Sequence, residues 1–189
     1  MKPIIEDELF KNEDYRRTPL TISDYDNCSF EQCDFSNGNL SGIVFNECEF
    51  IDCNLSNTTI KNTTFNDVTF SGCKLLGLEF KHINTFLMRF SFSNCNLQMT
   101  QFDFLKLKQT LFVNCELQQA TFNGTDLSQA VFDESNLQDT LFDDANLEGA
   151  HFQTAYNFNI DPERNKMQGA RFSNSDLEGL LQKYKLKID

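Results

Sequence analysis

Large apolar residues recur every five positions along most of this chain, and this period constrains the fold more than any other feature. A first block runs through Phe30, Phe35, Leu40, Phe45, Phe50, Leu55, Ile60, Phe65, Phe70, Leu75 and Phe80. After a short break, the series resumes at Phe92 and continues in steps of five to Phe152. A period of five matches neither an α-helix, at about 3.6 residues per turn, nor a flat strand, at about 2. Both ordinary secondary structures are therefore excluded as the main element.

All seven cysteines lie two positions before one of these large apolar residues. Most other occupants of that position are small, and the three remaining positions of each group are mostly polar. Each group of five therefore has two inward and three outward side chains, and only stacked copies can bury a continuous core. The thiols are predicted to be buried and reduced, because Cys28 and Cys33 are five residues apart rather than in the short pairs that zinc sites use. The sequence predicts no metal and no cofactor.

The alternation of Phe and Leu indicates how many groups make one coil. From Phe92 to Phe152, the large apolar residues alternate between the two types without exception. A coil with four sides of five residues places Phe above Phe and Leu above Leu, with a rise of about 4.8 Å per coil. Phe112 is therefore expected to stack between Phe92 and Phe132. The prediction is an all-β solenoid with twenty residues per coil.

At this point the sequence resembles a pentapeptide-repeat protein, whose motif has a small residue, Asp or Asn, Leu or Phe, and two polar residues. Matching stretches include 33–37 (CDFSN), 53–57 (CNLSN), 125–129 (TDLSQ) and 145–149 (ANLEG). The resemblance covers roughly residues 20–177, and the chain resembles the quinolone-resistance and microcin-immunity branches of the family. It implies a right-handed quadrilateral β-helix that mimics the diameter and surface of duplex nucleic acid.

One solenoid domain is expected over residues 20–177, because a stacked core does not divide. Residues 1–19 are predicted to form an irregular N-terminal cap. Phe10 and Tyr15 fit the period, as in a degenerate first coil, but Glu8 and Glu13 stand at inward positions. The register shifts by two residues within about 81–91, where an outward deformation or bend is expected. An irregular loop is expected at about 153–166, where Asn157 and Pro162 take the large apolar positions.

The C-terminal segment 175–189 changes period. Ser175 and Glu178 form a capping box, so a short α-helix is predicted. Its apolar face would contain Leu177, Leu180, Leu181 and Tyr184, and Leu186 and Ile188 would follow as a terminal strand. This surface is either a plain cap or a homodimer interface, and the resemblance implies dimerisation.

The net charge is −12, and the acidic residues are unevenly distributed. Residues 18–60 and 109–160 contain no Lys or Arg. In the second run, the carboxylates average one per ~1.6 Å of the expected axis, against ~1.7 Å per charge for duplex DNA. Direct binding to nucleic acid is disfavoured and a basic partner is expected, although an acidic surface also serves solubility. The candidate partner-binding residues are Asp133, Glu134, Asp139, Asp143, Asp144 and Glu148.

Catalysis finds little support in the sequence. Neither His82 nor His151 lies beside a plausible nucleophile, and no phosphate-binding glycine loop is present. No signal-peptide pattern or long apolar segment is found, so a cytoplasmic protein without membrane association is expected. The leading hypothesis, by resemblance, is a non-enzymatic DNA mimic that binds DNA gyrase or another type II topoisomerase and protects it from inhibitors or toxins. The alternative is a structural or adaptor solenoid with an unrelated protein partner.

Overall fold

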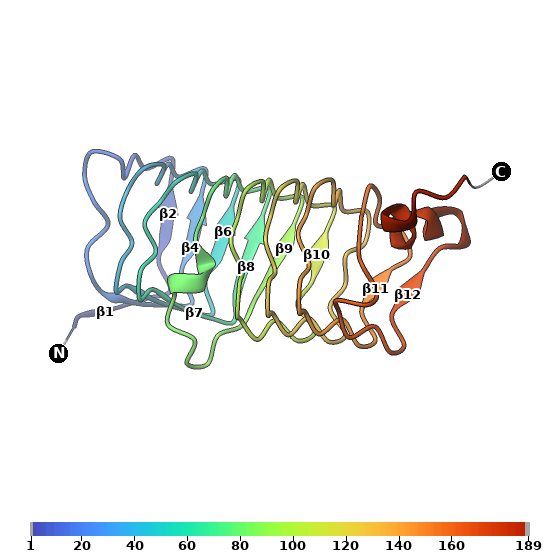
Figure 1. Cartoon of the computed structure of the whole chain (residues 1–189). Helices are drawn as coiled ribbons and strands as arrows, with labels where there is room; N and C mark the ends of the chain where they lie inside the picture. Colours follow the sequence, from blue (N-terminus) through green and yellow to red (C-terminus); the bar gives the residue numbers. More distant parts are fainter. Residues whose placement is uncertain (1, 188–189) are drawn as a thin grey trace.

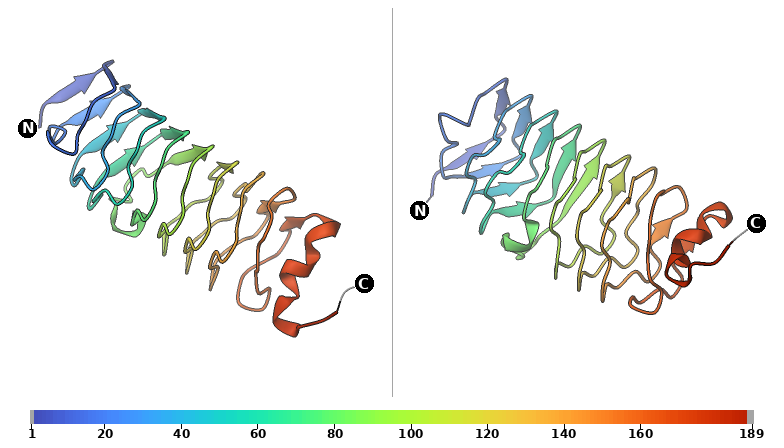
Figure 2. Two further views of the ribbon diagram at one scale, coloured as in Figure 1. Left: turned by 90° about the horizontal axis from the view of Figure 1, so that it is seen from above. Right: turned by 45° about the horizontal axis from the view of Figure 1, so that its top comes forward.

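The computed structural model describes residues 2–187 and shows coils stacked along one axis into a rod (Figures 1 and 2). The architecture is the predicted right-handed quadrilateral β-helix. Successive coils pair in parallel and are offset by twenty residues along most of the rod, as in Phe30↔Phe50. Because the offset equals four repeats, each side chain lies above its equivalent in the neighbouring coil.

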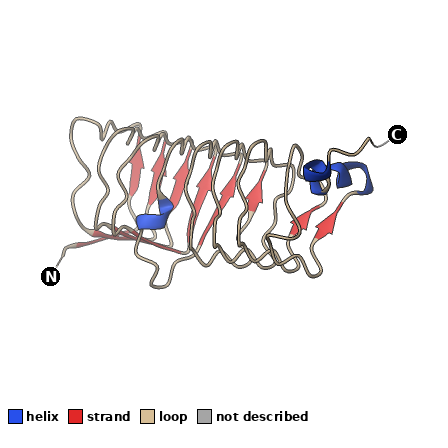
Figure 3. Ribbon diagram, in the orientation of Figure 1, coloured by secondary structure: helices blue, strands red, loops and turns tan. Residues whose placement is uncertain are grey.

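Short strands line two sides of the coils. One sheet has the order β1 (Ile4–Glu6), β3 (Asp24–Asp26), β5 (Val44–Asn46) and β7 (Thr64–Asn66). The other has the order β10 (Phe112–Val113), β9 (Phe90–Ser93), β8 (Val68–Ser71), β6 (Glu49–Ile51), β4 (Ser29–Glu31) and β2 (Leu9–Lys11). Near the C-terminus, β11 (His151–Phe152) pairs with β12 (Arg171–Phe172). The other sides are drawn as loops and turns (Figure 3), and isolated bridges such as Asn54↔Lys74 connect them between coils.

Phenylalanine columns form the core. The rings of Phe112 and Phe132 lie 4.9 Å apart with an interplanar angle of 3°, as the twenty-residue coil predicts. This column runs from Phe10 to Phe172, and neighbouring rings within it are separated by 4.8–5.3 Å. Rings on opposite sides of the coil meet edge to face, as do Phe112 and Phe122 at 84°. Both geometries suit aromatic quadrupoles, and each such pair is worth roughly 0.5–1.5 kcal/mol beyond its buried area.

Small inward residues connect successive coils by hydrogen bonds. The Cys53 thiol donates to the Phe30 carbonyl at 3.2 Å, and the Thr58 hydroxyl donates to the Phe35 carbonyl at 2.8 Å. All seven thiols are buried and free. Desolvation by burial raises the pKa of the Cys48 thiol to about 12. Cysteine suits this position because it is small and apolar and still supplies a weak donor.

Most corners of the coils are occupied by a residue in the left-handed conformation. Asn37 and Asn57 both have φ of 55°, and Asp, Gln, Glu or Gly occupy most equivalent corners. Asn and Gly adopt this conformation at low cost, which explains the polar residues after each large apolar one. Leu87, Met99 and Phe104 are exceptions, because large apolar side chains occupy the same conformation.

The N-terminal segment differs from the predicted irregular cap of residues 1–19. Strands β1 and β2 pair in register with β3 and β4, so this segment forms a first coil. Phe10 stacks on Phe30 at 4.8 Å, whereas Glu8 and Glu13 remain exposed. The carboxylates are tolerated at inward positions because this coil lies at the open end of the rod.

The register break lies in one coil. After the short 3₁₀ helix η1 (Phe80–His82), the backbone still pairs Thr64 with Asn84, but β9 then pairs Phe92 with Phe70, an offset of 22. The extra residues lie in a loop that projects from the rod (Figure 1). Phe86 and Leu87 in this loop are 71% and 63% exposed. Phe90 turns back inward, and its ring lies 5.3 Å from that of Phe80.

The irregular segment near residue 160 preserves the core by a one-residue shift. Asn157 has φ of 58°, and Phe158 is buried where the repeat would place residue 157. Ala155 and Ile160 are buried as well. Asn165 fastens the segment to the preceding coil, because its side chain accepts from the Ala145 amide at 2.9 Å and donates to the Phe142 carbonyl at 3.0 Å.

The C-terminal helix is present, but it is not the predicted α-helix. It consists of two 3₁₀ segments, η2 (Asn174–Leu180) and η3 (Gln182–Tyr184). Its N-cap is Ser173, which accepts from the Ser175 amide, so the predicted capping box at Ser175 is wrong. At about 3.0 residues per turn, positions i and i+3 align, but i+4 and i+7 do not. The predicted apolar face is therefore not continuous.

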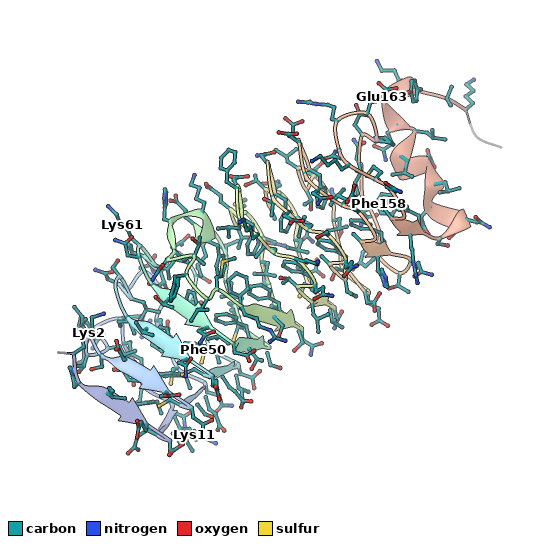
Figure 4. All side chains as sticks on the ribbon, turned by 90° about the horizontal axis from the view of Figure 1, so that it is seen from below. Lys2, Lys11, Phe50, Lys61, Phe158 and Glu163 are labelled. Carbon is teal, nitrogen blue, oxygen red and sulfur yellow. The ribbon has the colours of Figure 1, made fainter. Side chains whose placement is uncertain are left out.

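Close packing at one glycine fixes this helix against the last coil. Gly179 is buried, and a Cβ added there would lie 2.5 Å from the ring and carbonyl of Phe158. The Ile160 amide also donates to the Gly179 carbonyl at 3.0 Å. Figure 4 shows Phe158 beside the helix, which covers the C-terminal end of the core.

Substitution of one stacked ring should weaken the whole rod. Phe112→Ala removes a fully buried ring and should lower the free energy of unfolding by roughly 3–5 kcal/mol. Phe104→Ala is the matched control, because Phe104 is 79% exposed and should change stability by about 0.5 kcal/mol or less. Guanidinium unfolding followed by circular dichroism measures both, and equal losses would contradict the column.

The buried thiols should be unreactive while the protein is folded. The thiolate is the reactive form, and burial disfavours it. At pH 8 we expect Ellman's reagent to label fewer than about one thiol per folded chain, and all seven in guanidinium. Rapid labelling of several thiols without denaturant would show that the inward positions open to solvent.

Candidate protein-binding surface

The six acidic residues singled out by the sequence lie in a single coil. They follow the buried residues Phe132, Leu137, Phe142 and Leu147 by one or two positions, so they occupy successive corners. Glu134, Asp139 and Asp144 are left-handed corner residues with φ of 54°, 56° and 52°. We call this set the acidic ring: Asp133, Glu134, Asp139, Asp143, Asp144 and Glu148.

The ring does not bring its six carboxylates to one face. Only the neighbours Asp133 with Glu134, and Asp143 with Asp144, share a corner. The ring is also partly compensated, because Arg164 forms an ion pair with Asp143 at 2.6 Å. Thr154 donates to Asp133 at 3.2 Å. A flat partner could contact two corners of the ring at most.

A second acidic feature lies along one edge in the N-terminal half. We call it the acidic stripe: Asp7, Glu47 and Asp67, at the corner that follows β1, β5 and β7, together with Asp26, the last residue of β3. Asn27 occupies the equivalent corner after β3, so Asp26 lies one position before it. Backbone hydrogen bonds place these corners side by side, from the Asp7 amide to the Asp26 carbonyl at 3.1 Å and from the Glu47 amide to the Asn66 carbonyl at 2.8 Å. Arg89 lies 3.6 Å from Asp67, and this cation marks the end of the stripe.

The stripe was missed by the sequence analysis, although a signal for it exists. Its members are about twenty residues apart, so a linear search for charge runs does not group them. Writing the sequence in rows of twenty would have aligned Asp7, Glu47 and Asp67 in one column, with Asp26 in the column beside it. The ring shows the opposite effect, because residues close in sequence spread around the rod.

The residues predicted to form a dimer interface are only partly exposed. Leu177, Tyr184 and Leu186 are 41%, 51% and 57% exposed, whereas Leu180 and Leu181 are half-buried. Ile188 lies outside the described residues. The structure therefore leaves three apolar side chains at this end accessible to a partner.

Tyr184 is also bonded within its own chain. Its hydroxyl donates to Glu163 at 2.7 Å, and the neighbouring Lys183 contacts Asp161 at 2.6 Å and Glu163 at 2.8 Å. The hydrogen bonds from Lys183 lower the pKa of the Asp161 and Glu163 carboxyls. This network holds the C-terminal helix against the irregular segment.

The described residues, 2–187, also bear on metal sites and membrane-spanning helices. In that range, no three His, Cys, Asp or Glu side chains are grouped so that they could hold a metal ion. No helix within the same range is long and apolar enough to cross a membrane. His82 contacts Glu79 at 3.1 Å, and both side chains are exposed. The features that could contact a partner are therefore the charged and apolar surfaces.

Solved structures with the same fold include three of QnrB1, described as a plasmid-mediated fluoroquinolone resistance protein. Two trypsin-treated variants of it are each 18% identical to this chain, with TM-scores of 0.65. The alignments cover 98% and 97% of this chain and 100% and 99% of theirs. The full-length form is 18% identical with a TM-score of 0.50, covering 97% of this chain and 100% of that one. A search of curated proteins found no significant match.

The family comparison covers nearly all of the rod. The model for "Pentapeptide repeat region" matches residues 23–90 and 85–183, so the two matches meet at the projecting loop. Together with the stacked five-residue sides, these matches show that the chain belongs to the pentapeptide repeat family.

Proposed function

We propose that this protein is a non-enzymatic DNA mimic that binds the basic, DNA-holding surface of DNA gyrase or another type II topoisomerase. The acidic stripe carries the proposal, because it presents carboxylates in successive coils along one edge of a straight rod. A rod that occupies the DNA site competes with DNA. Such competition would protect the enzyme, in the cytoplasm, from inhibitors or toxins that act on its DNA-bound form.

The spacing of the stripe supports this mimicry. Successive coils place one charge per ~4.8 Å along the edge, against one phosphate per ~3.4 Å of axis along one DNA strand. Lysine and arginine side chains are long enough to accommodate this difference. The interaction would be steered by charge and weakened by salt.

The acidic ring would extend the contact at the other end of the rod. Its two paired corners carry Asp133 with Glu134 and Asp143 with Asp144. In a homodimer joined at the C-termini, the rings of the two copies would lie near the centre of a longer acidic rod. The stripe would then provide the outer contacts on each copy.

Charge-neutralised variants test the mimicry. Changing each Asp to Asn and each Glu to Gln within the stripe, or within the ring, should weaken inhibition of gyrase supercoiling at least tenfold and reduce its dependence on salt. The stripe loses four charges, so the matched control neutralises four scattered exposed carboxylates: Glu49, Asp52, Glu79 and Glu178.

The control variant should retain inhibition within about threefold, because surface charges away from a contact contribute little. Circular dichroism should be the same for all three variants. Full inhibition by the stripe and ring variants would refute mimicry, and so would equal loss in the control.

A structural or adaptor role is the second candidate. It is favoured by the distribution of ring carboxylates over different corners and by the Arg164 ion pair with Asp143. In that case the acidic surface serves solubility, and a different protein binds elsewhere. Neutralising either acidic feature would then leave partner binding unchanged.

We also propose that the C-terminal end forms a homodimer. The exposed Leu177, Tyr184 and Leu186 would supply its apolar contacts, with Leu180 and Leu181 packed behind them. Tyr184 would contribute its ring face, because its hydroxyl is already bonded to Glu163.

Sedimentation measures this association. Leu177→Glu with Leu186→Glu should convert the dimer to a monomer, because buried unpaired carboxylates are costly at an interface. Ile4→Glu with Leu9→Glu is the matched control at the other end of the rod, where both residues are exposed. A wild-type monomer at tens of micromolar, or loss of the dimer in the control, would contradict the proposal.

A further inference from the structure

A groove of about 400 Å³ runs along the outer face of the β1–β3–β5–β7 sheet. Its floor follows one row of outward side chains, paired in register from coil to coil: Ile4, Asp24, Val44, Thr64 and Asn84. A second row contains Asp26, Asn46 and Asn66. This groove is separate from the acidic ring and from the C-terminal apolar surface.

One end of the groove is acidic. Asn66 donates to Asn46, and Asn46 donates to Asp26 at 2.7 Å, so the amide ladder ends on a carboxylate. Asp24 lies on the adjacent row of the same strand, and the acidic stripe continues along this edge. Lys2 of the same chain approaches Asp24 at 3.8 Å, which shows that an ammonium group fits beside this carboxylate.

The other end of the groove is apolar. The projecting loop places Phe86 and Leu87 there, 71% and 63% exposed. The Phe86 amide donates to the Asn84 side chain at 3.1 Å, which fixes the base of the loop. Leu87 is held in the left-handed conformation with φ of 55°, which is unfavourable for a bulky side chain. The loop thus exposes two large side chains that contribute little to the core.

We propose that this groove binds an extended segment of a partner protein that carries a lysine or arginine and a large apolar side chain. The cation would pair with Asp24 and Asp26, and the apolar side chain would pack on Phe86 and Leu87. Charge complementarity selects this occupant, because the groove lining contains these two carboxylates and, among the described residues, no lysine or arginine. The rows of the groove are straight and parallel to the rod axis, which suits an extended backbone.

The length of the groove sets the spacing of the two side chains. Asp24 and Asn84 are separated by three coils, or about 14 Å. An extended strand covers this length in about four residues, and side chains four apart point to the same face. The recognised pattern is therefore a cationic residue followed or preceded at four positions by a large apolar one.

A labelled peptide tests this pattern directly. The probe is fluorescein-GSKTVTFSG, and two comparison peptides replace its Lys by Glu or its Phe by Ser. Fluorescence anisotropy should show saturable binding of the probe to the full chain, half-complete below about 1 mM, and at least tenfold weaker binding of both comparison peptides.

Variants assign each preference to one end of the groove. Asp24→Asn should abolish the preference for Lys over Glu and keep the preference for Phe over Ser. Phe86→Ser should abolish the preference for Phe over Ser and keep the preference for Lys over Glu. Asp52→Asn and Met99→Ser are matched controls, because both residues are exposed on other corners of the rod. Both controls should keep both preferences.

Three results would overturn the inference: no saturable binding, preferences that persist in the groove variants, or preferences that disappear in the controls. Self-association is tested separately by sedimentation of Asp24→Asn and Phe86→Ser. A change in oligomeric state in those variants would identify a second copy as the occupant and exclude the peptide proposal. Because gyrase takes no part in these measurements, the result does not depend on the proposed DNA mimicry.

Discussion

The structure depends on one constraint, which is that each coil pairs in parallel with the next, at an offset of twenty residues along most of the rod. This pairing satisfies the backbone hydrogen bonds of a chain whose individual strands are only two to four residues long. It also places each side chain on its own equivalent in the next coil. The core is therefore built from columns of like residues, and the aromatic stacking of Phe10 through Phe172 is its direct consequence.

Features that repeat were predictable from the sequence, and features at the ends were not. The Phe112 column and the burial of the thiols follow from spacing alone. At the N-terminus, Glu8 and Glu13 argued against a coil because a carboxylate cannot be buried, but the open end leaves them in water. At the C-terminus, the α-helical period failed because the close contact of Gly179 with Phe158 accompanies a narrower 3₁₀ helix. Both errors arise because the first and last coils each lack a neighbour on one side, and the repeat pattern carries no information about how those ends are covered.

The twenty-residue coil also determines where charged side chains lie on the surface. The ring residues were chosen as a run in the sequence, and the coil distributes such a run over all four sides. The stripe residues are far apart in sequence, and the coil brings them to one edge of the rod. A binding surface on this fold is therefore a column pattern, and linear charge density describes the whole circumference rather than any one face. That is why the fold could be predicted from the sequence while the candidate site could be predicted only in part.

The projecting loop shows how such a column pattern can be changed without loss of the core. Pairing continues up to Asn84, and it resumes where the Arg89 amide donates to the Phe65 carbonyl at 3.0 Å. The intervening residues need not enter the ladder, so they can project at the point where the side begins. Phe90 then replaces the missing core residue from the far end of the insertion. Because an insertion of this kind closes one end of a straight row of side chains, it converts an open sheet face into a groove of defined length. The position of the insertion in the twenty-residue coil thus determines which face acquires a groove.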